Sequence, residues 1–251
     1  MSKIVSIHSY RGGTGKSNTT ANLATLLAMR GKRVGVVDTD IQSPGIHAIF
    51  GLEEAEFNHS LNDYLWGLCD IAEASYDVTD KLPEKIDGKI FLIPSSLNPG
   101  EIARILREGY DVGLLDSGFQ ELLQELELDA LLIDTHPGLN EETLLSIAIS
   151  DNVIIILRPD TQDYLGTSVT VEVARKLDVH GLMLAVNKVP EVFDFDQIKK
   201  TVEDTYKTEV AALLPHSDEM MILGSGGLFV LQYKDNPVTK ALNQLVDRIL
   251  E

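Results

Sequence analysis

Three features that many proteins have in quantity are scarce in this chain: cysteine, long apolar runs and positive charge. The one cysteine, Cys69, cannot form an internal disulfide. Apolar runs such as NVIIIL end well short of the roughly 20 residues that cross a bilayer, so no transmembrane helix is expected. The first residues do not combine a basic start, an apolar core and a small-residue cleavage site. We therefore expect a soluble, cytoplasmic protein.

Negative charge exceeds positive charge by a wide margin. The chain has 21 Lys and Arg against 39 Asp and Glu, which gives a formal net charge of −18. This charge opposes general attraction to nucleic acid or to anionic lipid, although a local basic patch on a folded dimer could overcome it. Composition therefore weakens a DNA-binding interpretation without excluding it.

Short apolar runs rich in Val and Ile alternate with longer helical patterns along the chain. Strands are predicted at 3–8, 33–38, 89–94, 130–135, 152–157, 181–187 and 209–214. Helices are predicted at 16–30, 98–107, 117–127, 140–149, 162–178, 196–206 and 236–250. Strand and helix in alternation predict a parallel sheet with helices on both sides.

The length of 251 residues and the hydrophobic content of 44% suit one large domain with a sizeable core. We predict a single doubly wound α/β domain over residues 1–251, with a mainly parallel sheet flanked by helices. The segment 51–89 fits this pattern least clearly. It is interpreted as a helical insertion or a partner surface within the domain.

The first strand leads into the stretch IHSYRGGTGKSNTTANLA, residues 7–24. Its three glycines, at positions 12, 13 and 15, let the backbone curl around an anion at the start of the following helix. Lys16 can then reach the terminal phosphates of a nucleotide, and the Ser17 hydroxyl is placed to bind Mg²⁺. The alternative is a glycine-rich turn with an incidental lysine. The strict pattern GxxxxGK[ST] fails because Tyr10 occupies its first glycine position, so the motif is a variant.

Carboxylates follow two other strands. Asp38 and Asp40, in VVDTDIQSPGIHAIFGL, would project to the same side of an extended strand. Beside Mg²⁺ and a triphosphate, such a pair can hold the waters of the metal and orient the attacking water. Asp134, in LLIDTHPGL, can bind Mg²⁺ through water. A turn with a helix cap, for the pair, and simple strand termination, for Asp134, are the structural alternatives.

These segments resemble the deviant Walker A, Asp-x-Asp switch and Walker B segments of the ParA/MinD family of P-loop ATPases. The resemblance covers nearly the whole chain, and DTDIQSPGIHAIFGL is closer to the MinD branch than to the plasmid-partition branch. It continues through LAVNKV, where the family uses an asparagine such as Asn187 to recognise adenine, and through LLPHSDEM, near the base-flanking Pro215. The resemblance implies ATP and Mg²⁺ as cofactors, and a homodimer that ATP closes and hydrolysis releases.

The resemblance also implies roles for individual residues. The residues expected to bind the nucleotide are Gly12, Gly13, Thr14, Gly15, Lys16, Ser17, Asn18, Asn187 and Pro215. Ser17, Asp38 and Asp134 are expected to hold the metal. Lys16, Asp40 and Arg11 are the expected catalytic residues, with Asp40 positioning the attacking water.

Two positions depart from the family pattern. Arg11 stands where the family has its signature lysine, which crosses the dimer interface to the ATP of the partner. Arg11 could do the same, bend back to its own phosphates, or lie along the surface. His136 and Pro137 stand where a proline pair is common. His136 is interpreted as a packing or hydrogen-bonding residue rather than an acid–base catalyst.

The leading hypothesis for function is an ATP-dependent dimerising switch ATPase that positions or partitions an intracellular cargo, such as a carboxysome, plasmid, chromosome or protein cluster. An adaptor or activator protein on the cargo is the expected partner, and non-specific DNA a possible matrix, with nucleoid association as its consequence. The candidate DNA-contacting residues are scattered: Arg175, Lys176, Lys199, Lys200, Lys207, Lys234, Lys240 and Arg248.

Two alternatives remain open. One is a slow nucleotide-binding regulator that gates a partner protein, and the other is a MinD-like membrane-associated regulator of cell division. The membrane alternative is disfavoured, because the apolar stripe of the last helix is expected to face the core and only Lys240 and Arg248 flank it.

Overall fold

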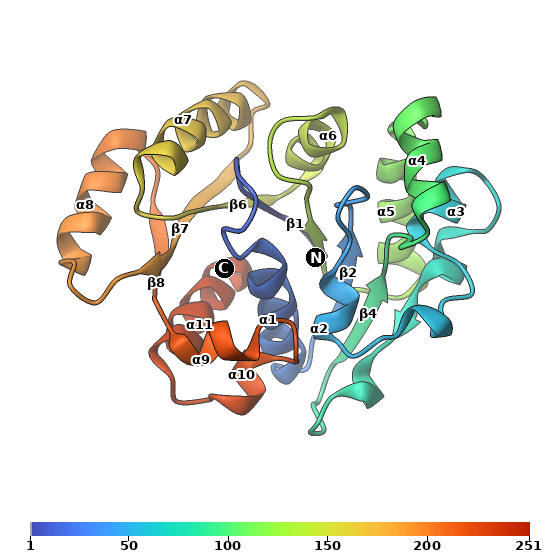
Figure 1. Cartoon of the computed structure of the whole chain (residues 1–251), viewed down its shortest axis with the longest axis horizontal. Helices are drawn as coiled ribbons and strands as arrows, with labels where there is room; N and C mark the ends of the chain where they lie inside the picture. Colours follow the sequence, from blue (N-terminus) through green and yellow to red (C-terminus); the bar gives the residue numbers. More distant parts are fainter. Residues whose placement is uncertain (1) are drawn as a thin grey trace.

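In the computed structural model, residues 2–251 are described, and their strands form one sheet in the order β3-β4-β2-β5-β1-β6-β7-β8 (Figure 1). The strands are β1 (Lys3–His8), β2 (Arg33–Asp38), β3 (Tyr76–Asp77), β4 (Lys89–Ile93), β5 (Ala130–Asp134), β6 (Asn152–Leu157), β7 (Gly181–Val189) and β8 (Val210–Pro215). Neighbouring strands pair in parallel, except that the short edge strand β3 runs antiparallel to β4. The predicted mainly parallel α/β fold is confirmed.

Helices cover both faces of this sheet. They are α1 (Lys16–Met29), α2 (Ile46–Ile49), α3 (Leu61–Leu65), α4 (Pro99–Glu108), α5 (Gly113–Glu125), α6 (Glu141–Ile149), α7 (Thr161–Lys176), α8 (Phe195–Tyr206), α9 (Asp218–Leu223), α10 (Phe229–Gln232) and α11 (Pro237–Leu250). In Figure 1, α1, α10 and α11 lie below the sheet, whereas α6 and α7 lie above it, with α8 to the left of β8 and α5 to the right of β2. The fold is therefore doubly wound.

Strands that are apolar on both sides explain this layering. In β1, Val5 and Ile7 are fully buried in the core cluster under α1 and α11, whereas Ile4 packs into the cluster under α5 on the other face. Such strands can be buried only between two layers of helices. The continuous apolar runs in the sequence thus dictate the three-layer arrangement.

The strand order places three loops side by side. β5 lies between β2 and β1, so the carboxyl ends of these strands are neighbours although their sequences are far apart. The chain then passes from β5 to β6 on the other side of β1. Ligands of open parallel sheets bind at such a reversal of strand order.

Several boundaries differ from the predicted ones. The helix predicted at 117–127 spans Gly113–Glu125, and its first turn is supported by Asp111, whose Oδ1 accepts from the Gly113 amide at 2.9 Å. The strand predicted at 181–187 continues to Val189. Glycines at positions 113 and 118 obscured the helical pattern, because glycine is unfavourable inside helices.

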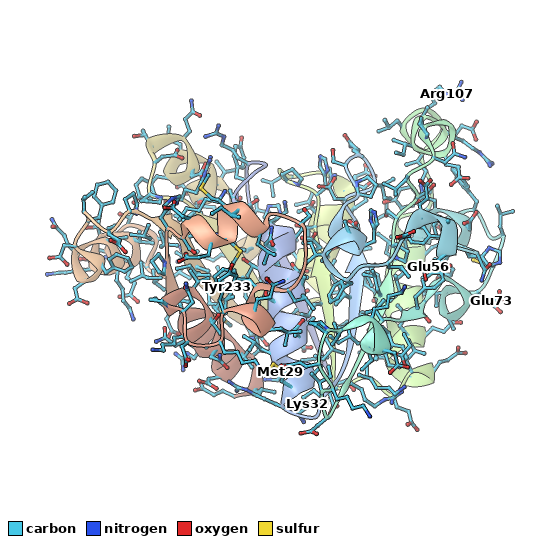
Figure 2. All side chains as sticks on the ribbon, turned by 60° about the horizontal axis from the view of Figure 1, so that its bottom comes forward. Met29, Lys32, Glu56, Glu73, Arg107 and Tyr233 are labelled. Atoms are coloured by element: carbon cyan, nitrogen blue, oxygen red, sulfur yellow. The ribbon has the colours of Figure 1, made fainter. Side chains whose placement is uncertain are left out.

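The segment 51–89 consists mainly of short elements. It contains α3, β3 and 3₁₀ turns at Glu54–Glu56, Ile71–Ala74 and Thr79–Lys81. Figure 2 shows Glu56 and Glu73 from this segment on the same side of the molecule as Arg107 of α4. The interpretation of the segment as a partner surface stays a prediction.

The last helix contributes to the core. Leu242, Leu245, Val246 and Ile249 are buried against α1 and β8, as the apolar stripe predicted, whereas Leu250 is 41% exposed. Within residues 2–251, none of the helices has the length and hydropathy that a membrane span requires.

Candidate functional site

The loop between β1 and α1 forms a cradle at the N-terminus of α1. Gly13 and Gly15 have φ angles of 75° and 100°, a left-handed conformation that side chains rarely adopt. A Cβ on Gly15 would also lie 2.5 Å from Asn187 Nδ2, so a side chain there would be strained and would displace Asn187. Lys16 begins the helix and is 7% exposed. Backbone N–H groups at a helix N-terminus, with an adjacent lysine, form an anion-binding site.

An open cleft of about 430 Å³ lies over this cradle. Its lining includes the glycines of the loop, Lys16, Ser17 and Asn18, together with Asp40, Ser43, Pro137 and Lys188. In the described part of the chain, the buried atoms Thr14 Oγ1 and Asn18 Oδ1 have no hydrogen-bond partner. Buried polar atoms without partners are unfavourable in a closed core and mark a place where a polar ligand can bind.

Two buried carboxylates lie at the ends of neighbouring strands. Asp38 and Asp134 are register partners across β2 and β5, and each is 1% exposed. Burial and the charge of Asp134 raise the pKa of Asp38 well above its usual range. Burial raises the pKa of Asp134 to about 6, although the charge of Lys16 opposes this shift. At neutral pH, the site therefore holds negative charge that a cation would stabilise.

The donors around Asp134 fit magnesium. The nearby Ser17 hydroxyl lowers the pKa of this carboxyl group, and Thr20 Oγ1 lies 3.4 Å from its Oδ1. Across residues 2–251, no three His, Cys, Asp or Glu side chains cluster into a metal site of their own. Mg²⁺ is commonly held by one or two carboxylates together with water and substrate phosphates, so this oxygen-only set is suitable.

Asp40 reaches the cleft by a different route from the one predicted. β2 ends at Asp38, so strand alternation does not apply at Asp40. Asp38 instead accepts from the amides of Asp40 and Gly45 at 3.0 and 3.1 Å, which folds the loop back over the strand end. The turn interpretation of Asp38 was thus partly correct. The Asp40 carboxyl lines the cleft, and its Oδ1 lies 2.7 Å from His136 Nδ1.

Arg11 points away from the cradle. Its Nη1 lies 3.3 Å from Asp163 Oδ1 and 3.7 Å from Asp160 Oδ1 at the start of α7. Asp163 is buried and is also bound by Arg158, whose Nε donates to Oδ2 at 2.9 Å. Arg11 itself remains 40% exposed. The side chain is thus held in its own subunit, close to the surface and outside the lining of the cleft.

A second cavity, of about 200 Å³, adjoins the cleft and shares Gly15, Asn18 and Lys188 with it. Pro215, Leu214, Met220 and Leu242 give it apolar walls. Asn187 stands at its edge, but its amide is used locally: Nδ2 donates to Thr14 O at 2.8 Å, and Oδ1 accepts from the Lys188 amide. In this structure the Asn187 side chain therefore stabilises the conformation of the cradle loop.

Three residues that contact the cradle or hold Arg11 were not predicted to do so. Lys188 has a left-handed φ of 57°, and its Nζ donates to Gly13 O at 2.9 Å, so it spans the cradle. Its position directly after Asn187 was the only pattern in the sequence that could have indicated a place at the site. No pattern in the sequence indicated Arg158 and Asp163. Asp163 is 152 positions from Arg11, and an ion pair over that separation leaves no local pattern.

Comparison with known proteins gives concordant results. Residues 2–182 match the AAA_31 family model, described as an AAA domain. An uncharacterised ATP-binding protein of Methanocaldococcus jannaschii is 26% identical over 253 residues, covering 100% of this chain and 88% of that protein. The cell division ATPase MinD of Pyrococcus furiosus has a TM-score of 0.83 at 22% identity, with 100% and 99% of the chains covered. Septum site-determining protein MinD of Pyrococcus horikoshii, complexed with Mg-ADP, has a TM-score of 0.80 at 21% identity, with 99% and 96% covered.

The buried carboxylate pair predicts that Asp134→Asn stabilises the nucleotide-free protein. The pKa of Asp134 in the folded protein, about 6, lies above its ordinary value of 3.8, so folding disfavours the charged form. At pH 7.5 the substitution should raise the free energy of unfolding by about 1 to 3 kcal/mol. The gain should shrink as the pH falls through 6 towards 4, because the native Asp134 then takes up a proton.

Urea denaturation at pH 7.5 and pH 5 measures both effects. Asp235→Asn, at an exposed carboxylate, is the matched control and should change stability by less than about 0.5 kcal/mol. A variant Asp134→Asn that is less stable than the wild type at pH 7.5 would contradict the analysis.

Proposed function

Because this chain belongs to the ParA/MinD family of P-loop ATPases, we propose that it is an ATP-dependent dimerising switch that positions or partitions an intracellular cargo. The observation that carries the proposal is the meeting of Lys16, Asp40 and the buried pair Asp38 and Asp134 at one edge of the sheet. These groups come from the start of α1, the carboxyl ends of β2 and β5, and the loop after β2. A phosphate cradle beside buried carboxylates is the arrangement that phosphoryl transfer requires.

The two adjoining spaces suit the two ends of ATP. The phosphates would occupy the cleft over the glycines and Lys16, and the adenine would enter the apolar cavity beside Asn187 and Pro215. Lys188 lines both spaces and would lie where they join. The Mg-ADP complex of MinD from Pyrococcus horikoshii supports the choice of ligand at the level of the family.

Each polar group then has a role. Lys16 would hold the terminal phosphates, and Ser17, Asp38 and Asp134 would hold Mg²⁺, directly or through water. The metal would supply positive charge to the phosphate oxygens. Asp40, at the surface of the cleft, would accept a hydrogen bond from the attacking water and orient it. Such positioning, rather than strong base catalysis, provides most of the rate enhancement in phosphoryl transfer.

Arg11 would act on the ATP of a second subunit. Its ion pair with Asp163 joins a guanidinium that is 40% exposed to a buried carboxylate, over a long Nη1–Oδ1 distance of 3.3 Å. Contact of the guanidinium with water weakens the attraction between the two charges. When Arg11 separates from Asp163, Arg158 still neutralises this buried carboxylate, so no unpaired charge remains in the core. A triphosphate in the partner subunit can therefore capture Arg11 at little cost, and the planar guanidinium can bind several phosphate oxygens at once.

The candidate DNA-contacting residues differ in their local contacts, and DNA binding stays a prediction. Lys234 and Arg248 are ion-paired with Glu84 and Glu209, and Arg175 donates to backbone carbonyls at the end of α8. Lys199 and Lys200 of α8 are exposed and have no ion pair among the described residues. We propose an adaptor protein on the cargo as the principal partner.

Three kinds of switch can be separated by co-sedimentation of the ATP-loaded protein with non-specific DNA and with anionic liposomes over a salt series. ATP-dependent retention on DNA supports a partition-type switch, and retention on liposomes supports a MinD-like membrane regulator. Retention on neither supports a slow regulator that gates a partner protein. Binding through phosphates should weaken steeply as salt rises.

Asp40→Ala should bind ATP but accumulate as an ATP-bound dimer. The substitution removes the group that orients water and leaves the cradle intact. Light scattering with ATP and Mg²⁺ should give the dimer mass, and phosphate release should fall by roughly 10² or more. A variant that stays monomeric with ATP, or that hydrolyses it at the wild-type rate, contradicts the role of Asp40.

Arg11→Ala should bind ATP nearly as tightly as the wild type and yet lose dimerisation, hydrolysis or both. An arginine supplied in trans contributes roughly 10³ to 10⁵ in rate, and Arg11→Lys should retain part of it. Arg107→Ala, at an exposed arginine of α4 labelled in Figure 2, is the matched control and should behave like the wild type.

A mixing experiment tests the geometry in trans. Lys16→Ala subunits, which should not bind ATP, keep an intact Arg11. When they are mixed with Arg11→Ala subunits, each mixed dimer can hold one ATP opposite one Arg11. Recovery of turnover in the mixture is the expected result, whereas full activity of Arg11→Ala alone would exclude the role.

A further inference from the structure

His136 makes a direct contact with the proposed water-positioning carboxylate. Its Nδ1 lies 2.7 Å from Asp40 Oδ1, and the two side chains are 21% and 15% exposed. The contact joins the loop after β5 to the loop after β2. An ionised carboxylate only accepts hydrogen bonds, so with Asp40 ionised the proton between them belongs to His136 Nδ1. The family resemblance offers no counterpart, because proline is common at this position and has no side-chain donor.

The hydrogen bonds of Asp40 are unequally divided between its two oxygens. Oδ1 accepts from His136 Nδ1 and also from the Ser43 amide, at 3.2 Å. Oδ2 accepts no hydrogen bond from any group within residues 2–251. Two donors on one oxygen fix the rotation of the carboxyl group, and the other oxygen is left free to accept from a ligand or water.

His136 is itself held in place. It precedes Pro137, and a residue before proline is restricted to extended backbone conformations. Its carbonyl accepts from Thr143 Oγ1 at 3.3 Å, and the Gly138 amide donates to Ser9 O at 3.1 Å. The loop after β5 is therefore fastened to α6 on one side and to the cradle loop on the other. A donor on such a loop has a defined position.

We propose that His136 is the positioning residue for Asp40. The Nδ1–H group holds Oδ1, together with the Ser43 amide, so that Oδ2 is presented to the attacking water in the cleft. This inference rests on the proposed function, because it assigns a partner to the carboxylate that orients water. A displacement of about 1 Å in a positioned group can lower a rate by roughly 10²-fold, so this contact affects kcat rather than ATP binding.

The test compares three substitutions that differ in donor position. His136→Asn keeps an amide nitrogen at the same number of bonds from the backbone as Nδ1. His136→Gln moves the amide one bond further, and His136→Ala removes it. We expect the Ala and Gln variants to lose roughly 10- to 100-fold in kcat, with the affinity for ATP within about twofold of wild type and prolonged ATP-bound dimers. The Asn variant should retain at least about a third of wild-type kcat.

His180→Ala is the matched control, because His180 is an exposed histidine just before the amino end of β7, whereas Lys188 lines the cleft near the carboxyl end of this strand; the substitution should not affect turnover. If the Ala variant folds poorly, the comparison of Asn with Gln still decides the question. Asn and Gln variants that are equally impaired would show that the donor is not what matters. A variant His136→Ala with unchanged kcat would also overturn the proposal. An increase in kcat would identify the contact as a restraint on Asp40 and would likewise overturn it.

A double substitution tests whether His136 acts through Asp40. In an Asp40→Ala background, His136→Ala should lower kcat by less than about twofold further, because the group it positions is gone. A full second loss would mean that His136 acts independently. Wild-type protein that hydrolyses no ATP would overturn the proposed function itself, and this role with it. Normal wild-type hydrolysis with unaltered His136 variants would overturn this role alone.

Discussion

Two carboxylates buried next to each other at the ends of adjacent parallel strands are the constraint on which this structure depends. Asp38 and Asp134 are aligned by the register of β2 and β5, and the surrounding core leaves them almost no contact with water. Their mutual repulsion is unfavourable in the free protein, and positive charge is the simplest way to relieve it. Lys16 supplies part of that charge from the start of α1. A cation at the phosphates of a nucleotide would supply the rest.

The same carboxylates organise the loops that form the cleft. Asp38 binds two amides of the loop after β2, and this places Asp40 at the surface of the cleft. His136 then connects Asp40 to the loop that follows Asp134. Lys188 and Asn187, from β7, fasten the cradle from the other side. A ligand that moves any one of these loops therefore acts on the others, which is the property a nucleotide-dependent switch requires.

Local patterns in the sequence were sufficient for the fold, and they singled out the residues that line the candidate site. Apolar runs and helical periodicity predicted the strands of the parallel sheet, because strands buried on both faces must be apolar throughout. Glycines 12, 13 and 15 and Lys16 predicted the cradle, because few other functions need that combination. The contacts of Arg11 with Asp163 and of His136 with Asp40 could not be predicted, since each joins segments about 100 residues or more apart. The segment 51–89 was also unclear, because its short turns have no long periodic pattern.

The central claim is that the carboxylate pair binds a proton until Mg-nucleotide replaces it. Metal binding requires deprotonated ligands, so it releases any proton that the ligands hold. Titration calorimetry of Mg-ATP binding, in buffers of different ionisation enthalpy, counts the protons released. Because burial raises the pKa of Asp38 well above its usual range and that of Asp134 to about 6, the account predicts release of protons on binding at pH 6 and a smaller release as the pH rises. Binding heats that do not depend on the buffer at pH 6 would contradict it.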